Sequence, residues 1–188
     1  RAKKFLYDPG IEVAFIMRWP DGNIGGGKTC DWLLSQVDFL PTLLEWVGVQ
    51  IPENVQGVSF AGAFEGREPG SPRDAIFGIF HPMGIRCVRT HRYKLIRNFE
   101  FRMLLEVPVD AEHPRTQKEK CPAVQFFDLG KDPDEFQNRA NEPEYADTVI
   151  DLNDRLWTWL GDVEDPILKG PAPTPYYREA MADYPKRY

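Results

Sequence analysis

A short apolar run near the amino terminus constrains the fold more than any other stretch. Residues 12–19 are almost continuously apolar and lie between the Pro9-Gly10 turn and Pro20. A run of this length, bounded by turn residues, is typical of a buried strand. A lysine pair, Lys3-Lys4, precedes it. Because α/β enzymes commonly hold their chemistry at the ends of buried strands, the pattern is compatible with a solvated basic terminus or with a functional loop that feeds a core strand.

Composition limits the classes of protein that the chain can belong to. Its 188 residues are 42% hydrophobic and 13% aromatic, which suits one domain, or part of a domain with a smaller one. A net charge of −6 argues against nucleic-acid binding through a basic surface. No run of about 18 apolar residues occurs, so no membrane span is expected. Cys30, Cys87 and Cys121 are odd in number and lack C-x-x-C spacing, which indicates neither a disulfide framework nor a zinc site.

A glycine-rich loop suggests nucleotide binding as an alternative. The segment from Gly22 to Thr29 fits the P-loop pattern, in which backbone N–H groups and a lysine, here Lys28, bind phosphates. A P-loop runs directly into a long helix, however, and Pro41 would interrupt a helix that begins at Lys28. Asp38 is a better amino-terminal cap for the next helix. A surface loop is therefore favoured, and a P-loop enzyme stays an alternative.

Glycine and proline residues divide the chain into two parts. They are frequent over residues 48–73, which predicts a long surface loop and a boundary between domains at 1–73 and 74–188. Residues 75–80 form a compact apolar run that predicts a strand. Residues 86–97 alternate apolar and charged side chains about a central turn, which predicts a hairpin.

The rest of the second domain is expected to complete an α+β unit. Residues 125–129 predict another strand, and apolar residues at helical spacing between Asn141 and Gly161 predict a helix that packs on the sheet. The polar residues 106–122 are expected to be a mobile excursion. The aromatic, proline-rich tail from Pro166 is expected to wrap over the body of the protein.

Several segments carry a family resemblance when they are taken in chain order. They are Lys3 with Tyr7, Gly10 and Arg18-Trp19-Pro20, followed by residues 34–44 (LSQVDFLPTLL), 89–96 (RTHRYKLI), 127–135 (FDLGKDPDE) and 165–171 (DPILKGP). Together they resemble the sulfatases, and most closely the heparan N-sulfatase (N-sulfoglucosamine sulfohydrolase) branch with its bacterial relatives. The resemblance implies that the chain is the carboxyl-terminal portion of a sulfatase.

This resemblance implies a fold of the α/β class. Residues 1–73 would be the end of an alkaline-phosphatase-like sulfatase catalytic domain with a mostly parallel sheet. Residues 74–188 would be the smaller α+β subdomain, an antiparallel sheet with one packed helix and a wrapping tail. The parent enzyme would be exported, periplasmic or lysosomal, and its partners would be a sulfated carbohydrate substrate and the amino-terminal part of the same sulfatase.

The resemblance also implies which chemical groups lie elsewhere. Sulfatases use a formylglycine nucleophile, made from Cys or Ser in a C/S-x-P-x-R motif, and a calcium ion held by Asp and Asn side chains. Neither motif occurs in this chain, which is therefore expected to hold no metal ligands and to be inactive alone. A non-catalytic carbohydrate-binding module is a further alternative.

Three residues are candidates for the site. Lys3 matches the sulfate-contacting base of the family and is the predicted catalytic residue, with Lys4 as the alternative if the loop slips by one residue. His81 and Arg86 are predicted to bind substrate, although a structural histidine and an ion-paired arginine are competing interpretations. Gly78 stands where the family often has a glutamate, which puts a heparan-type substrate in doubt.

Overall fold

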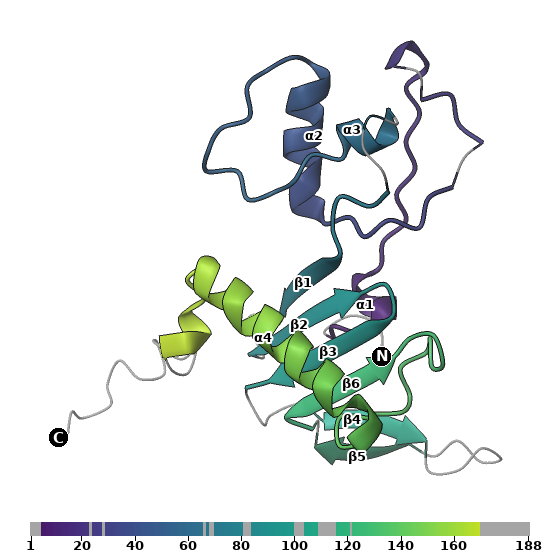
Figure 1. Cartoon of the computed structure of the whole chain (residues 1–188). Helices are drawn as coiled ribbons and strands as arrows, with labels where there is room; N and C mark the ends of the chain where they lie inside the picture. The colour runs from purple at the N-terminus through teal and green to yellow at the C-terminus, as the bar shows by residue number, and fades with distance from the viewer. Residues whose placement is uncertain are drawn as a thin grey trace, which may run out of the picture. The chain divides into compact units, whose positions relative to one another are not determined.

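The computed structural model describes residues 5–22, 24–27, 29–65, 67, 70–80, 84–99, 104–108, 116–120 and 122–169. The chain divides into two compact units (Figure 1). The sheet unit comprises Arg1–Glu12 and Phe77–Tyr188, and the helical unit comprises Val13–Ile76. The first residues of the chain therefore group with the sheet unit. The division into a catalytic part, 1–73, and a subdomain, 74–188, stays a prediction.

A four-stranded sheet forms the centre of the sheet unit, with the strand order β1-β2-β3-β6. The strands are β1 (Ala75–Phe80), β2 (Ile85–Thr90), β3 (Tyr93–Asn98) and β6 (Val124–Asp128). β2 pairs antiparallel with β3, and β3 pairs antiparallel with β6. Leu95 of β3 lies opposite both Val88 and Phe126. The strand, the hairpin and the further strand that the sequence predicts are thus confirmed.

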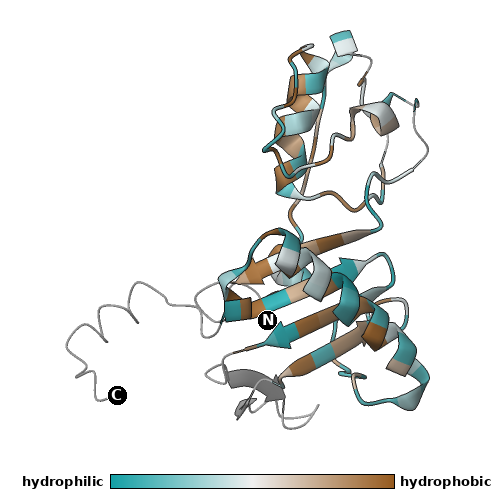
Figure 2. Ribbon diagram, turned by 60° about the vertical axis from the view of Figure 1, so that its left-hand side comes forward, coloured by the Kyte–Doolittle hydropathy of each residue, from teal (hydrophilic) through white to brown (hydrophobic). Residues whose placement is uncertain are grey.

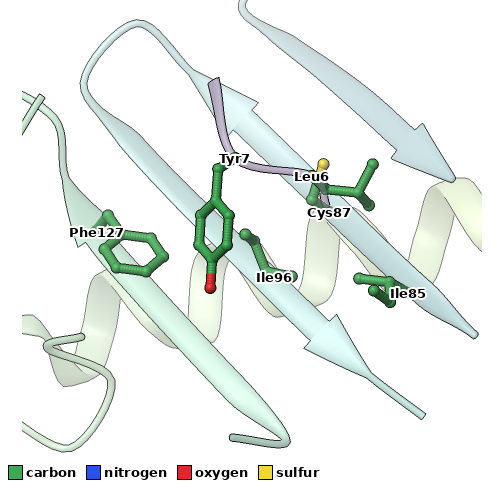
Figure 3. Packing of buried hydrophobic residues seen from close by; sticks show 6 residues of the cluster. All are labelled: Leu6, Tyr7, Ile85, Cys87, Ile96 and Phe127. Atoms are coloured by element: carbon green, nitrogen blue, oxygen red, sulfur yellow. The ribbon is translucent and has the colours of Figure 1, made fainter. Parts of the chain in front are cut away.

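Both faces of this sheet are covered by other parts of the chain. Side chains alternate between the two faces along each strand. Figure 2 shows that the central strands contain both hydrophilic and hydrophobic residues. The amino-terminal segment, residues 5–11, lies on one face, where Leu6 and Tyr7 join the core (Figure 3). The helix α4 lies on the other face and contacts β2 and β3. Side chains on both faces of the central strands are therefore buried, among them Cys87 and Ile96 on one face and Val88 and Leu95 on the other.

α4 (Ala146–Asp162) follows a 3-10 turn, η4 (Pro143–Tyr145), and leads to a second such turn, η5 (Pro166–Lys169). Leu152, Leu156 and Leu160 are buried at helical spacing, which confirms the predicted apolar face. The predicted helix start was wrong, because Pro143 begins a separate turn and Tyr145 takes the cap position without a side-chain hydrogen bond. The helix also continues through Gly161. The tail beyond residue 169 lies outside the described residues.

A second, two-stranded antiparallel sheet consists of β4 (Leu104–Pro108) and β5 (Thr116–Lys120). The prediction of a mobile excursion over residues 106–122 is wrong for these two strands. Polar composition indicates contact with water, but it does not exclude a hairpin. The ladder of a hairpin is formed by backbone N–H and C=O groups, whatever the side chains.

The helical unit contains α2 (Phe39–Trp46), α3 (Ala61–Phe64) and two 3-10 turns, η1 (Pro20–Gly22) and η2 (Gln36–Asp38). As predicted, α2 begins after Asp38. The Asp38 carboxylate does not cap this helix but accepts hydrogen bonds from the Ser35 and Val58 N–H groups and from the Arg73 guanidinium. Asp38 thereby links the segments that contain Val58 and Arg73 to the start of α2. α3 interrupts the long loop predicted over residues 48–73.

The buried strand predicted at residues 12–19 is wrong for this chain. Residues 12–18 have no regular secondary structure, and Ile16 is 92% exposed. None of the described strands pairs with this run. The apolar pattern indicates a segment suited to burial, but burial also requires neighbours that cover it. Residues 29–35 contain no helix, so the glycine-rich loop lacks the helix that a P-loop requires.

Candidate functional site

The amino-terminal segment is held on the sheet by apolar side chains. Leu6 and Tyr7 are 5% and 1% exposed, and they pack in one cluster with residues of β2, β3 and β6, namely Ile85, Cys87, Ile96 and Phe127 (Figure 3). The Tyr7 hydroxyl is also within the core, where Gln125 donates a hydrogen bond to it at 2.7 Å. A single helical turn, α1 (Asp8–Ile11), follows directly.

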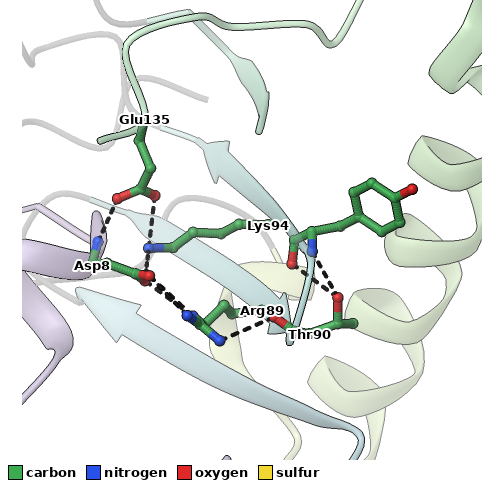
Figure 4. Close-up of polar contacts among 6 residues, drawn as sticks. Asp8, Arg89, Thr90, Lys94 and Glu135 are labelled. Carbon is green, nitrogen blue, oxygen red and sulfur yellow. Dashed lines mark hydrogen bonds and ion pairs between the residues drawn. The ribbon is translucent and has the colours of Figure 1, made fainter. Parts of the chain in front are cut away.

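A cluster of four charged side chains, here called the charge cluster, lies beside this turn (Figure 4). It consists of Asp8, Arg89, Lys94 and Glu135. Lys94 Nζ lies 2.7 Å from Asp8 Oδ1 and 2.8 Å from Glu135 Oε1. The Arg89 guanidinium donates to both carboxylate oxygens of Asp8, and the Asp8 backbone N–H donates to Glu135.

The alternation of the strands brings the charge cluster together. Arg89 follows Ile85 and Cys87 on one face of β2, and Lys94 shares the same face of β3 with Ile96. Glu135 lies in the turn after β6, where its φ of 57° places it in the left-handed region. Lys94 and Glu135 are fully buried, and Asp8 is 13% exposed. Two cations and two carboxylates therefore balance in a largely water-free site.

The two carboxylates have pKa values shifted in opposite directions. Burial raises the pKa of Asp8, but hydrogen bonds from Arg89 and Lys94 outweigh burial and hold this pKa below its usual value. Burial is the stronger influence on Glu135 and raises its pKa, although Lys94 opposes the effect. Glu135 is consequently the first of the two to accept a proton on acidification.

Asp8→Asn is expected to remove an acid-sensitive part of the stability of the sheet unit. Because the folded-state pKa of Asp8 lies below its ordinary value of 3.8, the ionised group stabilises the fold above that pH, and the contribution is lost as the pH falls through the lower folded-state value. The difference in free energy of unfolding between wild type and Asp8→Asn should therefore be largest near neutral pH. Urea unfolding from about pH 3 to 7 measures it, and a difference independent of pH would contradict the expectation.

Of the three residues predicted from the sequence, the structure describes only Arg86. Lys3 and His81, like the alternative Lys4, lie outside the described residues. Arg86 is 1% exposed, and its guanidinium forms a two-point ion pair with Asp165 at 2.7 and 2.9 Å and donates to the Ile85 carbonyl. In this chain Arg86 therefore links β2 to the turn that follows α4.

Reasoning from the sequence missed the charge cluster. The alternation of apolar and charged residues over 86–97 predicts the hairpin, but it assigns no role to Arg89 or Lys94. The sequence did contain a signal for burial. One apolar segment precedes the hairpin and another follows it, so each could cover one face of the sheet. A sheet covered on both faces buries the charged positions too.

The described part of the chain contains neither a cluster of metal-binding side chains nor a helix suited to span a membrane. Among the described residues, no group of three or more His, Cys, Asp or Glu side chains is placed to hold a metal ion. None of the helices in this part combines the length and the apolar composition that crossing a membrane requires.

Several known proteins with similar sequences are sulfatases. An ulvan-active sulfatase of Formosa agariphila is 30% identical over 88% of this chain and 31% of its own length. The human N-sulphoglucosamine sulphohydrolase is 23% identical over 88% of this chain and 40% of its own length. The chain thus spans only 31% and 40% of these two curated relatives.

Solved structures and a family match complete the comparison. The structure of a 2-O GAG sulfatase has a TM-score of 0.54 at 22% identity, covering 70% of this chain and 26% of that one. A structure in complex with D-glucosamine-2-N,6-O-disulfate has a TM-score of 0.50 at 25% identity, covering 72% and 25%. The predicted sulfatase fold, with its carboxyl-terminal sheet and packed helix, is confirmed. Residues 2–160 match the family described as "N-sulphoglucosamine sulphohydrolase, C-terminal", and the chain belongs to this family.

Proposed function

We propose that the protein containing this chain is a sulfatase that hydrolyses sulfate ester or sulfamate groups of a sulfated sugar. The observation that carries the proposal is the family match over residues 2–160, which includes Lys3 and the docked amino-terminal segment. Relatives that are named as ulvan-active, as an N-acetylglucosamine-6-O-sulfatase and as N-sulphoglucosamine sulphohydrolase support a sulfated sugar as the substrate class.

Lys3 would contribute the positive charge that this reaction needs. Attack at sulfur requires a nucleophile, neutralisation of the sulfonyl oxygens and stabilisation of the leaving group. A lysine ammonium is a compact donor suited to a sulfonyl oxygen or to the leaving atom. The docked segment supports this role, because Tyr7 is fixed in the core only four positions after Lys3.

The nucleophile and the metal would come from outside this chain. A formylglycine would supply the attacking oxygen and a calcium ion would polarise the sulfate group. The described residues do not fit a calcium cage, since they contain no suitable cluster of ligands. The amino-terminal part of the same sulfatase is therefore the proposed source of both.

His81 and Arg86 are secondary parts of the proposal, as contacts to the sugar. Arg86 has a strong competing role, because its guanidinium is already bound to Asp165 and to a backbone carbonyl. Binding a sugar through Arg86 would require the release of Asp165.

An exposed apolar surface on the helical unit supports the amino-terminal part as a partner. α2 exposes Leu40 and Leu43, 54% and 55% exposed, and Val47 beyond its end is 69% exposed. Val13 and Ile16, in the extended run before it, are 62% and 92% exposed. Leu40, Leu43 and Val47 recur at helical spacing, and an exposed apolar helix face of this kind is typical of an interaction surface. The relatives contain more than enough additional chain to cover it.

Leu43→Glu is expected to weaken the full-length protein but not the 188-residue chain. In the chain alone the side chain already contacts water, so the free energy of unfolding should change by no more than about 0.5 kcal/mol. In the full-length protein a buried, unpaired carboxylate should lower the melting temperature. Ile150→Glu on α4, at 58% exposure, is the matched control. Equal behaviour of the two variants in the full-length protein would exclude Leu43 from the interface.

Sulfate release tests the proposed function directly. The full-length protein should release sulfate from at least one of ulvan, N-acetylglucosamine-6-O-sulfate and D-glucosamine-2-N,6-O-disulfate, and the 188-residue chain alone should release none. Calorimetric titration of the chain with ATP tests the nucleotide-binding alternative, which predicts binding that Lys28→Ala abolishes. No sulfate release from any of the three, together with ATP binding, would overturn the proposal.

A further inference from the structure

We propose that the charge cluster sets the register of the amino-terminal segment, so that Lys3 and not Lys4 is presented to the sulfate group. The inference rests on the proposed function, because it takes Lys3 as the sulfate-binding residue. Asp8, Arg89, Lys94 and Glu135 are positioning residues in this account. None of the four is required to touch the substrate.

The geometry of Asp8 supports this role, because its side chain and its backbone are both engaged. Its carboxylate accepts hydrogen bonds from Arg89 and Lys94, on two neighbouring strands. Its backbone N–H donates to Glu135, in a turn 127 residues later in the sequence. Three separate parts of the sheet unit therefore converge on one residue, five positions after Lys3 (Figure 4).

A one-residue slip of the segment would break all of these contacts. In the slip that brings Lys4 to the place of Lys3, Pro9 takes the place of Asp8. Proline has neither a carboxylate nor a backbone N–H. Arg89 and Lys94 would then lose their shared acceptor, and Glu135 would lose its N–H donor.

Apolar packing alone specifies this register less sharply. Phe5, Leu6 and Tyr7 are three consecutive apolar or aromatic residues, so neighbouring side chains can exchange two of the three positions in a slip. A buried ion pair adds little net stability over apolar residues of similar size, but removing one partner leaves the other charge buried and unpaired, which is costly. Fixing one register among near-equivalent alternatives is the best attested use of such buried polar groups.

Hydrogen exchange in the 188-residue chain tests the structural half of the inference. The amides of Gly10, Ile11 and Glu12 bond to the carbonyls of Tyr7 and Asp8. Asp8→Asn should speed exchange over residues 5–12 and leave β3 unchanged. Asp128→Asn is the matched control, because Asp128 is also a buried carboxylate, and its partners among the described residues include Arg92 and Tyr145 but no residue of the segment. It should not affect exchange over residues 5–12.

Turnover of the full-length protein tests the functional half. Asp8→Asn should lower kcat about 10-fold, within the ~10²-fold that a misplacement of about 1 Å can cost. Lys4→Ala should leave wild-type kcat unchanged but lower kcat further in the Asp8→Asn background, where the slipped register is populated. Lys94→Arg, which keeps the charge, should retain more activity than Lys94→Met. Asp128→Asn should show no coupling to Lys4→Ala.

The outcomes separate this inference from the proposed function. A defective Lys3→Ala together with wild-type kcat in Asp8→Asn, or without coupling between Asp8→Asn and Lys4→Ala, would overturn the positioning role alone. Wild-type kcat in Lys3→Ala would overturn the role of Lys3 and, with it, this inference.

Discussion

Lys3→Ala is expected to lower the turnover of the full-length protein by about 10²- to 10³-fold, the loss that follows removal of one preorganised donor to a developing negative charge. The sulfonyl oxygens carry the charge that the ammonium group would neutralise. Initial rates of sulfate release at saturating substrate measure the effect. Lys3→Arg should retain part of the activity, because the charge is kept although the geometry changes.

Two controls make the Lys3→Ala result specific. Lys4→Ala removes the same charge one position later and should leave turnover near the wild-type rate. The melting temperature of Lys3→Ala should also equal that of wild type, because Leu6 and Tyr7 supply the burial that holds the segment. Near-wild-type turnover in Lys3→Ala, or an equal loss in both variants, would remove Lys3 from its assigned role.

Lys94→Met is expected to reduce the free energy of unfolding by about 3–5 kcal/mol, the usual cost of breaking a buried ion pair by removing one partner. Lys94 is 0% exposed and lies between the carboxylates of Asp8 and Glu135. Methionine fills a similar volume, so loss of charge and not a cavity causes the effect. The shift of the urea unfolding midpoint in the 188-residue chain measures it.

Lys131→Met is the control for this prediction. Lys131 is also a lysine of the sheet unit with acidic neighbours, but its side chain is 52% exposed and it lies 3.7 Å from Glu144. An ion pair at such an exposed site contributes about 0–1 kcal/mol. A midpoint shift in Lys94→Met no larger than that in Lys131→Met would show that the charge cluster does not stabilise the fold.

Much of the sheet unit could be predicted from the sequence, because its elements have local signals. The alternation in residues 86–97 predicts the β2–β3 hairpin, and the spacing of Leu152, Leu156 and Leu160 predicts α4. The structural role of Arg89 and Lys94 could not be predicted in the same way. Alternation shows that two faces differ, but whether the charged face is also covered depends on segments far away in the sequence.

The run at residues 12–19 shows the opposite limit. Its composition is that of a buried strand, and yet Ile16 is 92% exposed in this chain. Hydrophobicity reports what a segment is suited to contact, but a strand also needs hydrogen-bonding neighbours. Arg86 shows a related limit, because its contacts in the fold could not be predicted from its neighbours in the sequence. Its pairing with Asp165 joins parts of the chain 79 residues apart, which no local pattern reveals.

Two contacts of the amino-terminal segment join residues that are far apart in the sequence. Tyr7 and Gln125 are 118 residues apart, and Asp8 and Glu135 are 127 residues apart. These separations have a consequence during protein synthesis. A ribosome makes the chain from its amino end, so the lysine-bearing segment emerges well before the groups that hold it. The bond from the Asp8 backbone N–H to Glu135 can form only after Glu135 has been translated. A truncated product that ends before Glu135 would carry every residue of the amino-terminal segment and still be unable to fix it.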